Sequence, residues 1–195
     1  MIFRARNTLT NQLLLLLLAV IYIATLINPG FEEKLFLFNR ALLSDGQLHG
    51  VAEGEWYRLV TAGFLHAGLT HLLFNLMALY TLGTPFEMIY GRIRYSALLF
   101  ISLICGSLAS ITFNAENQVS VGASGAIFGL FGALLVMRKA LGADLRSTLT
   151  LLAINVVIAV VVPNIDWRAH LGGLVGGALV ALIYRVLPAR GPRSL

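Results

Sequence analysis

The sequence contains few charged residues, and this scarcity limits the class of protein before any motif is considered. Asp, Glu, Lys and Arg make up 12% of the 195 residues, whereas 58% are hydrophobic. A soluble domain usually carries about 25% charged residues. Together with a mean hydropathy of +0.84, the composition excludes an ordinary water-soluble domain and indicates a chain whose solvent is lipid.

Cysteine is almost absent as well. The single Cys105 lies in an apolar run, so no internal disulfide can form and the redox compartment cannot be read from the sequence. The pI of about 9.8 does not predict a nucleic-acid partner, because the 14 Lys and Arg residues are spread between apolar runs and form no single basic face. We interpret them as topology signals.

Six apolar stretches predict an all-α membrane protein, a six-transmembrane-helix bundle that forms one domain over residues 1–195. Long apolar segments in a bilayer must be helical because every backbone group needs an internal partner. The fourth and fifth stretches are shorter than the roughly 20 residues that cross the hydrocarbon, which indicates a cavity open to water at one end. The predicted helices cover residues 13–27, 69–82, 95–113, 124–137, 149–162 and 171–187.

The basic residues orient this bundle. When alternate loops are assigned to opposite sides, ten Lys and Arg residues fall on the side of both termini and four on the other. By the positive-inside rule both termini are cytoplasmic, and we expect an integral protein of the bacterial inner membrane. The first helix shows no clear signal-peptide cleavage site and is expected to be retained. The ten residues are Arg4, Arg6, Arg92, Arg94, Arg138, Lys139, Arg146, Arg185, Arg190 and Arg193.

The one long connection, residues 28–68, mixes apolar residues with scattered charges. This pattern is typical of short amphipathic segments in the membrane interface. Trp56 and Tyr57 are expected at the depth of the headgroups.

Polar residues within membrane helices are costly, so each one is a functional candidate. Gly-Ala-Ser-Gly at 122–125 opens the fourth predicted helix, His71 and Asn75 lie early in the second, and Ala-His-Leu-Gly-Gly at 169–173 opens the sixth. In the predicted topology all three segments fall in the outer half of the membrane. They can therefore meet.

Ser124 and His170 are the candidate nucleophile and base. A serine alone is common as a helix cap or packing residue, and its hydroxyl needs a base at neutral pH. The imidazole of His170 has a suitable pKa, although a lone histidine at a helix start can also be interfacial. Two G-x-x-x-G faces below these residues would let their helices pack closely. The glycines are Gly125, Gly129, Gly173 and Gly177.

His71 and Asn75 are four residues apart and share one helix face. Amide hydrolysis needs donors aimed at the oxyanion of the tetrahedral intermediate, and these two side chains with the Ser124 N–H would supply three. The alternative is structural, with Asn75 bonded to another helix and His71 satisfied in the core. Asn155 in the fifth helix is expected to form an interhelical hydrogen bond or to serve helix packing.

In combination these motifs resemble the rhomboid family of intramembrane serine proteases, in its minimal six-helix form. The resemblance covers most of residues 55–177. Trp56 and Arg58 resemble the family's Trp-Arg signature in the first loop, and Phe64-Leu65-His66 leads into its second helix. Gly83, Glu87 and Gly91 resemble the turn into the third helix.

This resemblance implies roles for individual residues. Ser124 and His170 become a dyad with no third carboxylate, and His71, Asn75 and the Ser124 amide become the oxyanion site beside Gly122. His66 matches a positioning residue near the mouth of the site, and Trp56 and Arg58 match supporting residues. The family often has tyrosine four residues after the nucleophile, stacked on the histidine; here that residue is Phe128. The implied substrates are single-span membrane proteins with small residues at the cut and helix-breaking residues beyond it.

Other function classes fit the sequence less well. His66, His71 and His170 could converge on zinc or serve a haem, but the sequence has no His-Glu-x-x-His and no carboxylate within the second, fourth or sixth predicted helix. No metal or cofactor is therefore expected. A transporter would show paired halves with broken helices, which we do not find. A non-proteolytic rhomboid-like scaffold or chaperone that binds membrane helices stays open as the alternative.

Overall fold

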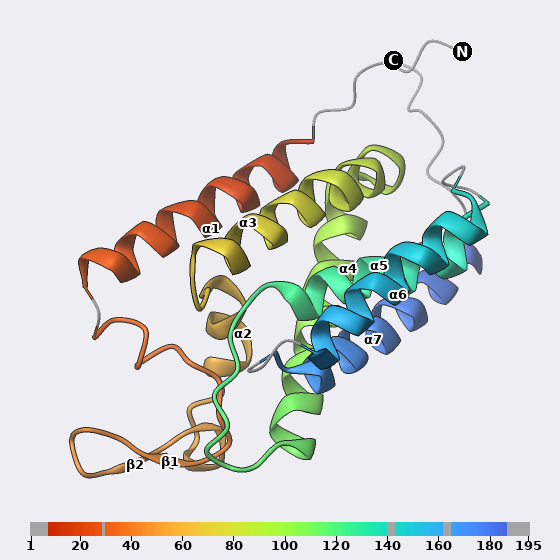
Figure 1. Ribbon diagram of the computed structural model, residues 1–195. Helices are drawn as coiled ribbons and strands as arrows, with labels where there is room; N and C mark the ends of the chain where they lie inside the picture. The colour runs from red at the N-terminus through yellow and green to blue at the C-terminus, as the bar shows by residue number, and fades with distance from the viewer. Residues whose placement is uncertain (1–7, 29, 140–142, 162–164, 187–195) are drawn as a thin grey trace.

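The computed structural model describes residues 8–28, 30–139, 143–161 and 165–186. They form a helical bundle with a small irregular lobe at one end (Figure 1). A π-helical turn, η3 (Leu79–Gly83), joins α3 to α4. This mostly helical and apolar architecture agrees with the predicted all-α membrane fold. The long helices are α1 (Leu9–Ile27), α3 (Leu69–Ala78), α4 (Thr84–Phe113), α5 (Ser124–Met137), α6 (Leu145–Val161) and α7 (Trp167–Val186).

Among the described residues, three helical segments are long and apolar enough to cross a membrane: Leu9–Ile27, Leu69–Phe113 and Trp167–Val186. The middle segment is 45 residues long and turns at Gly91, whose backbone has φ 77° and ψ 169°. Glycine adopts this left-handed conformation without the steric cost that a Cβ would add. The helices α5 and α6 are apolar but shorter, with 14 and 17 residues.

The predicted helix boundaries need correction. The fourth helix is α5, as predicted, but the turn expected between residues 82 and 95 is helical except at Gly91. The helices α1, α6 and α7 each begin four residues before the predicted start. Their first turns contain polar or charged side chains, which a search for apolar runs excludes from the helix. The predicted ends at residues 162 and 187 lie outside the described residues.

The centre of the bundle is α5, in which every residue from Gly125 to Leu134 is buried. It packs chiefly against α4 and α7. Because lipid provides little hydrophobic drive for helices to associate, such packing relies on close van der Waals contact between small residues. The four glycines of α5 and α7 named above supply these contacts.

The start of α1 is tied to α4 by the buried carboxylate of Glu87. It accepts hydrogen bonds from the backbone N–H groups of Thr10 at 3.0 Å and Asn11 at 2.7 Å. The Tyr95 hydroxyl donates to the Asn11 side-chain oxygen at 2.7 Å, and the Asn11 amide donates to the Leu79 carbonyl at 2.9 Å. A carboxylate at a helix N-terminus satisfies free N–H groups and complements the helix dipole.

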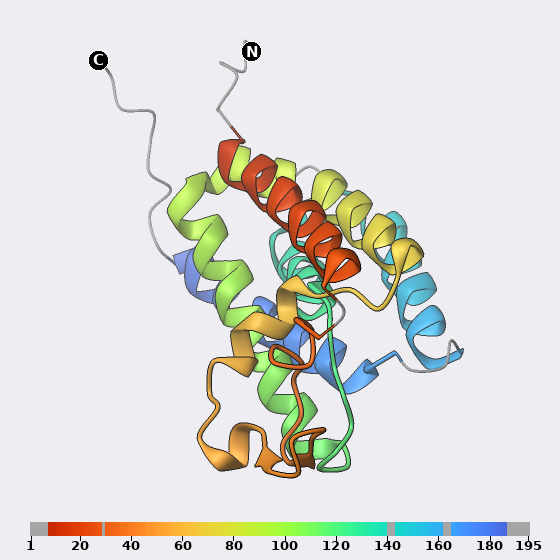
Figure 2. The same cartoon turned by 90° about the vertical axis from the view of Figure 1, so that its left-hand side faces the viewer.

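The long connection is more ordered than the predicted amphipathic segments. It contains an antiparallel hairpin of β1 (Ala41–Leu42) and β2 (Leu48–His49). Strands of two residues are too short to show an alternating pattern, so the sequence did not predict this hairpin. Three short helices follow: η1 (Val51–Glu53), α2 (Arg58–Thr61) and η2 (Ala62–Phe64). Figures 1 and 2 both place the hairpin and the end of α4 at the bottom, away from the start of α1.

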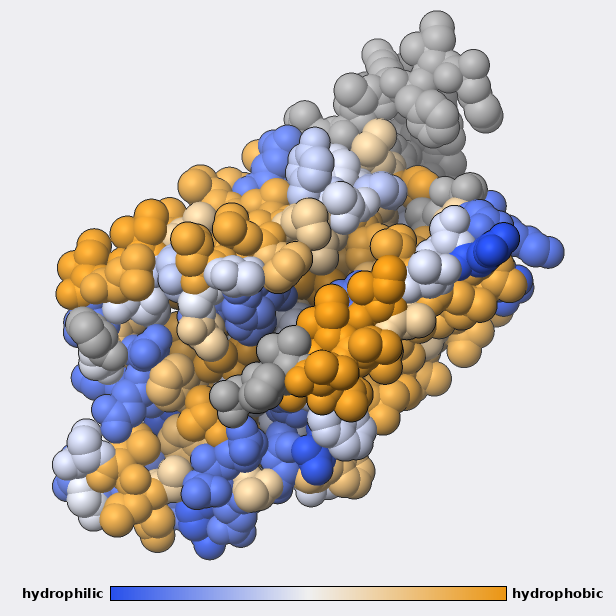
Figure 3. Space-filling model, viewed as in Figure 1, coloured by the Kyte–Doolittle hydropathy of each residue, from blue (hydrophilic) through white to orange (hydrophobic). Residues whose placement is uncertain are grey.

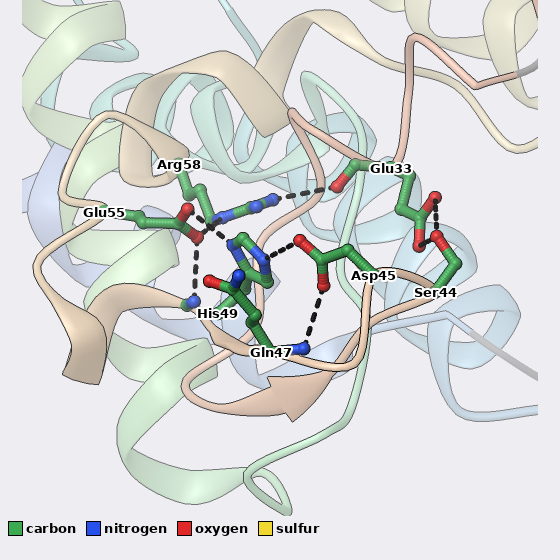
Figure 4. A network of polar contacts seen from close by, with 8 residues as sticks. Glu33, Ser44, Asp45, Gln47, His49, Glu55 and Arg58 are labelled. Atoms are coloured by element: carbon green, nitrogen blue, oxygen red, sulfur yellow. Dashed lines mark hydrogen bonds and ion pairs between the residues drawn. The ribbon is translucent and has the colours of Figure 1, made fainter.

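A polar network stabilises this lobe (Figure 4). His49 bridges two carboxylates, with Nε2 2.9 Å from Asp45 and Nδ1 2.9 Å from Glu55. The other Glu55 oxygen accepts from the Arg58 Nε at 2.6 Å and from the Gly50 N–H at 2.8 Å. Hydrogen bonds to Glu55 and Asp45 raise the pKa of His49. Partial burial raises the pKa of Glu55, but hydrogen bonds from His49, Arg58 and Gly50 outweigh it and lower that pKa to about 2.

These shifts predict a pH range in which the lobe is most stable. The raised pKa of His49 contributes stability below its ordinary value of 6.5, and this stability is lost as pH rises through the raised value. The lowered pKa of Glu55 contributes above 4.5 and is lost as pH falls toward about 2. Hydrogen-exchange protection of residues 41–49, corrected for intrinsic rates, is therefore expected to be highest between about pH 4.5 and 6.5. A His49→Gln variant should lose the fall in protection at higher pH; an unchanged profile would contradict the assignment.

Candidate active site

Ser124 and His170 lie together although 46 residues separate them. The Nε2 atom of His170 is 2.8 Å from the Ser124 Oγ, a normal hydrogen-bond length. His170 is buried, and its Nδ1 finds no hydrogen-bond partner among the described residues. If Nε2 accepts the serine proton, Nδ1 carries the ring proton of the neutral imidazole. No carboxylate among the described residues bonds to the ring.

Close packing of α5 on α7 produces this distance. A Cβ built on Gly173 would collide with the carbonyl oxygen of Gly125, and a Cβ on Gly177 would collide with that of Gly129. The two G-x-x-x-G faces predicted from the sequence therefore lie against each other. Since each collision would involve backbone, only glycine allows this approach of the two helices.

The chain enters α5 through Gly122, whose φ is +120°. The Gly122 N–H donates to the Ala62 carbonyl at 2.9 Å. A Cβ at this position would lie 2.7 Å from Cε1 and 2.9 Å from Nε2 of His71, and 3.6 Å from the Ser124 Oγ. Because Gly122 has no side chain, the His71 ring can lie close to Ser124. The first N–H groups of α5 have no hydrogen-bond partner within the helix.

Asn75 and His66 line the same cavity as the serine and histidine. The Asn75 amide donates to the His71 backbone carbonyl at 2.8 Å, while its oxygen is buried without a partner among the described residues. The His66 ring is buried and contacts His71 edge to face, with 5.2 Å between ring centroids. This hydrogen bond lies within α3, so it is not the bond to another helix that the structural alternative for Asn75 required.

Phe128 stacks on the catalytic candidate His170. Their ring centroids are 4.1 Å apart and the planes are inclined by 10°. The phenylalanine therefore keeps the aromatic contact that the family resemblance implies, without the tyrosine hydroxyl. A stacked ring limits the rotation of the imidazole and excludes water from one of its faces.

Of the two supporting residues in the long connection, only Arg58 is buried, with 1% of it exposed. Its Nη1 donates to the carbonyls of Glu33 at 3.0 Å and Phe36 at 2.8 Å, and its guanidinium lies 4.5 Å from the centroid of the Phe38 ring. Arg58 thus anchors the lobe. Trp56 is exposed, and is not among the residues that line the cavity.

Asp166 was missed by the sequence analysis. Its Oδ1 accepts from the N–H groups of Arg168 at 3.2 Å and Ala169 at 3.1 Å, which makes it the N-cap of α7. Its Oδ2 accepts from the Asn114 side chain at 3.0 Å. Burial raises the pKa of Asp166, but hydrogen bonds, that from Asn114 among them, lower it overall. Asp166 therefore joins the end of α4 to the turn of α7 that carries His170.

An Asp before the first residue of a helix is a recognised cap signal. Because the predicted start at residue 171 lay four residues too late, Asp166 was not recognised as the cap.

The cavity around the dyad has a volume of about 1280 Å³. Besides Ser124 and His170 it is lined by residues of α3 and α6, so it continues from the dyad into the space between these helices. Figure 3 shows apolar surface over α6 with hydrophilic surface at the end where α6 begins. In the part of the chain that the structure describes, no group of three or more His, Cys, Asp or Glu could hold a metal.

Comparison with known proteins identifies the family. Residues 53–186 match the model of the Rhomboid domain. The chain belongs to the rhomboid family of intramembrane serine proteases. This confirms the family prediction and the integral membrane character that the apolar helices indicate.

Several curated proteins are similar to this rhomboid chain. Putative rhomboid protease YdcA of Bacillus subtilis is 41% identical over 139 residues, which are 69% of this chain and 70% of YdcA. Rhomboid protease GluP of the same organism is 41% identical over 136 residues, 67% of this chain but 26% of GluP. RHOMBOID-like protein 1 of Arabidopsis thaliana is 37% identical over 148 residues, 72% of this chain and 38% of that protein.

Proposed function

We propose that this rhomboid protein is an endopeptidase that hydrolyses peptide bonds in or near the transmembrane segments of other membrane proteins. Ser124 is the nucleophile and His170 is the general base. The observation that carries the proposal is the 2.8 Å distance between the His170 Nε2 and the Ser124 Oγ, inside a cavity that continues between α3 and α6. Imidazole and hydroxyl at this distance can exchange a proton.

The reaction proceeds by acyl transfer. The Ser124 Oγ attacks the scissile carbonyl carbon while the His170 Nε2 takes the hydroxyl proton. Collapse of the tetrahedral intermediate breaks the C–N bond, and Nε2 returns the proton to the leaving amine. A water molecule then attacks the ester carbonyl, gives a proton to Nε2, and releases the acid as Ser124 regains its proton.

The developing oxyanion needs hydrogen-bond donors, and three groups that line the cavity would supply them. They are the Ser124 N–H, the His71 ring and the Asn75 amide, which keeps one proton beyond that bonded to the His71 carbonyl. Contact between Gly122 and His71 supports this arrangement. Each such donor is typically worth about 10² to 10³ in rate.

The membrane arrangement is proposed as a single domain over residues 1–195 with six spans. The arms of residues 69–90 and 92–113 and the helices α1, α5, α6 and α7 would be these spans. Both termini would lie in the cytoplasm of a bacterium, with the long connection in the outer interface of the inner membrane. Water would reach Ser124 from the outer face, since α5 begins there and contains 14 residues, fewer than the roughly 20 that cross the hydrocarbon.

A serine-directed fluorophosphonate probe tests the proposal. Detergent-purified protein is expected to be labelled at Ser124, and labelling should be lost in both Ser124→Ala and His170→Ala, because the hydroxyl is a poor nucleophile without its base. A Gly30→Ala variant, in which the added Cβ would lie 3.9 Å from the Asn28 side-chain oxygen, its nearest non-adjacent neighbour in the described part of the chain, is the matched control. A folded protein that resists the probe would favour the rhomboid-like scaffold that binds membrane helices without cutting them.

A further inference from the structure

The side of the cavity formed by α6 contains one polar side chain in an otherwise apolar run. Leu151, Asn155 and Ile158 recur at helical spacing and line the cavity. From Leu151 to Val161, Asn155 is the only polar residue in the sequence. It lies six residues before the end of α6, about 9 Å along the axis at 1.5 Å per residue. An amide at such a place in a membrane helix is costly unless it has a partner.

Asn155 forms no interhelical hydrogen bond with the described residues, which was one of the two roles expected from the sequence. Its amide nitrogen donates to the Leu151 carbonyl of its own helix at 2.8 Å, its one hydrogen bond to the described residues. A side-chain amide has two donor protons and one acceptor oxygen. Asn155 therefore retains one donor and one acceptor.

The part of the cavity formed by α3 includes apolar side chains as well as His71 and Asn75. Phe74 and Met77 line it and are 60% and 57% exposed. They offer contact to an apolar side chain but no hydrogen bond from their side chains. The cavity between α3 and α6 is thus lined by these apolar side chains and by Asn155.

We propose that Asn155 binds the main chain of the substrate where its transmembrane helix unwinds between α3 and α6. This inference rests on the proposed proteolysis. Ser124 can attack an amide only when the peptide is extended, and unwinding frees a backbone N–H and C=O that find no water in hydrocarbon. One donor and one acceptor on Asn155 match these two groups. Asn155 would thereby stabilise the unwound segment in the cavity. This would favour substrates that have helix-breaking residues beyond the cut.

The test compares two substrates. One is a single-span protein with a helix-breaking residue below the cut, and the other is a short water-soluble peptide that spans the same cut and has no membrane segment. Asn155→Leu, which removes donor and acceptor at similar size, is expected to lower kcat/KM for the single-span protein by roughly 5- to 150-fold, the effect of two net hydrogen bonds. Cleavage of the short peptide should not change, since it has no membrane segment to unwind against α6.

Two further variants separate binding from structure. Asn155→Gln keeps the amide and should recover part of the loss. Thr150→Leu removes a polar group from an exposed position of the same helix that does not line the cavity, and should cleave both substrates normally. An Asn155→Leu variant that cleaves both substrates normally, or loses both equally, would overturn the proposal.

A binding measurement separates this inference from the proteolytic one. In a Ser124→Ala background, Asn155→Leu should weaken binding of a labelled peptide corresponding to the substrate's membrane segment by the same factor. Unchanged binding would overturn the role of Asn155. Cleavage that persists in Ser124→Ala would instead overturn the proposed mechanism, whatever Asn155 does.

Discussion

A Ser124→Ala variant is expected to cleave a single-span substrate at least about 10⁴-fold more slowly than the unaltered protein. The change removes the only atom that forms the acyl intermediate, while the oxyanion donors and the substrate cavity are retained. Initial rates with purified protein in detergent, and again in proteoliposomes, provide the measurement.

The His170→Ala variant should lose a similar factor, and the double variant should be no slower than either single one. The reason is that a base without a nucleophile, or a nucleophile without a base, leaves the same residual catalysis. The unfolding midpoint of Ser124→Ala should stay close to that of the unaltered protein. Single losses that multiply in the double variant, or cleavage above about 1% in Ser124→Ala, would show that the two residues do not act as a unit.

The second large effect is expected at Gly173. In Gly173→Ala the new methyl group meets the backbone carbonyl of Gly125, which cannot rotate aside as a side chain could. The helices α5 and α7 must separate, and overpacking of this kind costs about 1–3 kcal/mol of unfolding free energy. A shift of about 1 Å between reacting groups can cost 10²-fold in rate, so cleavage should fall by about that factor.

Two further glycine variants serve as controls for this prediction. Gly177→Ala, whose Cβ would meet the Gly129 carbonyl, should behave like Gly173→Ala. Gly30→Ala should change neither the unfolding midpoint nor cleavage. A Gly173→Ala protein with normal stability and rate would mean that the helix contact has little effect on the dyad.

A comparison of predicted and observed helix boundaries shows which elements the local sequence pattern could predict. The start of α5 was predicted at the correct residue because Gly122 and Ser124 mark it by chemistry as well as by hydropathy. The helices α1, α6 and α7 were placed four residues late because their first turns carry polar side chains that belong to the helix but not to the apolar run. The hairpin at residues 41–49 had no detectable pattern, since two-residue strands contain no full period.

The candidate site shows the same division. Polar groups within membrane helices are energetically costly and are therefore functional candidates. On this ground the sequence indicated Ser124, His71, Asn75 and His170. Asp166 was missed because the start of α7 was placed four residues late, and its bond with Asn114 is visible only in the structure. Asn155 was expected to bond or pack between helices, and only the structure shows that it lines the cavity.

The amino-acid sequence alone determined that the chain is a helical membrane protein, since hydropathy and the cost of buried polar groups are properties of short segments, and its motifs resemble those of the rhomboid family. The tertiary structure decided which of these segments touch. The dyad distance depends on how closely the backbones approach at Gly125 and Gly173, and this approach arises only when α4, α5 and α7 pack together. The bond from Asn114 to Asp166 and the side of α6 that lines the cavity likewise appear only in the folded chain.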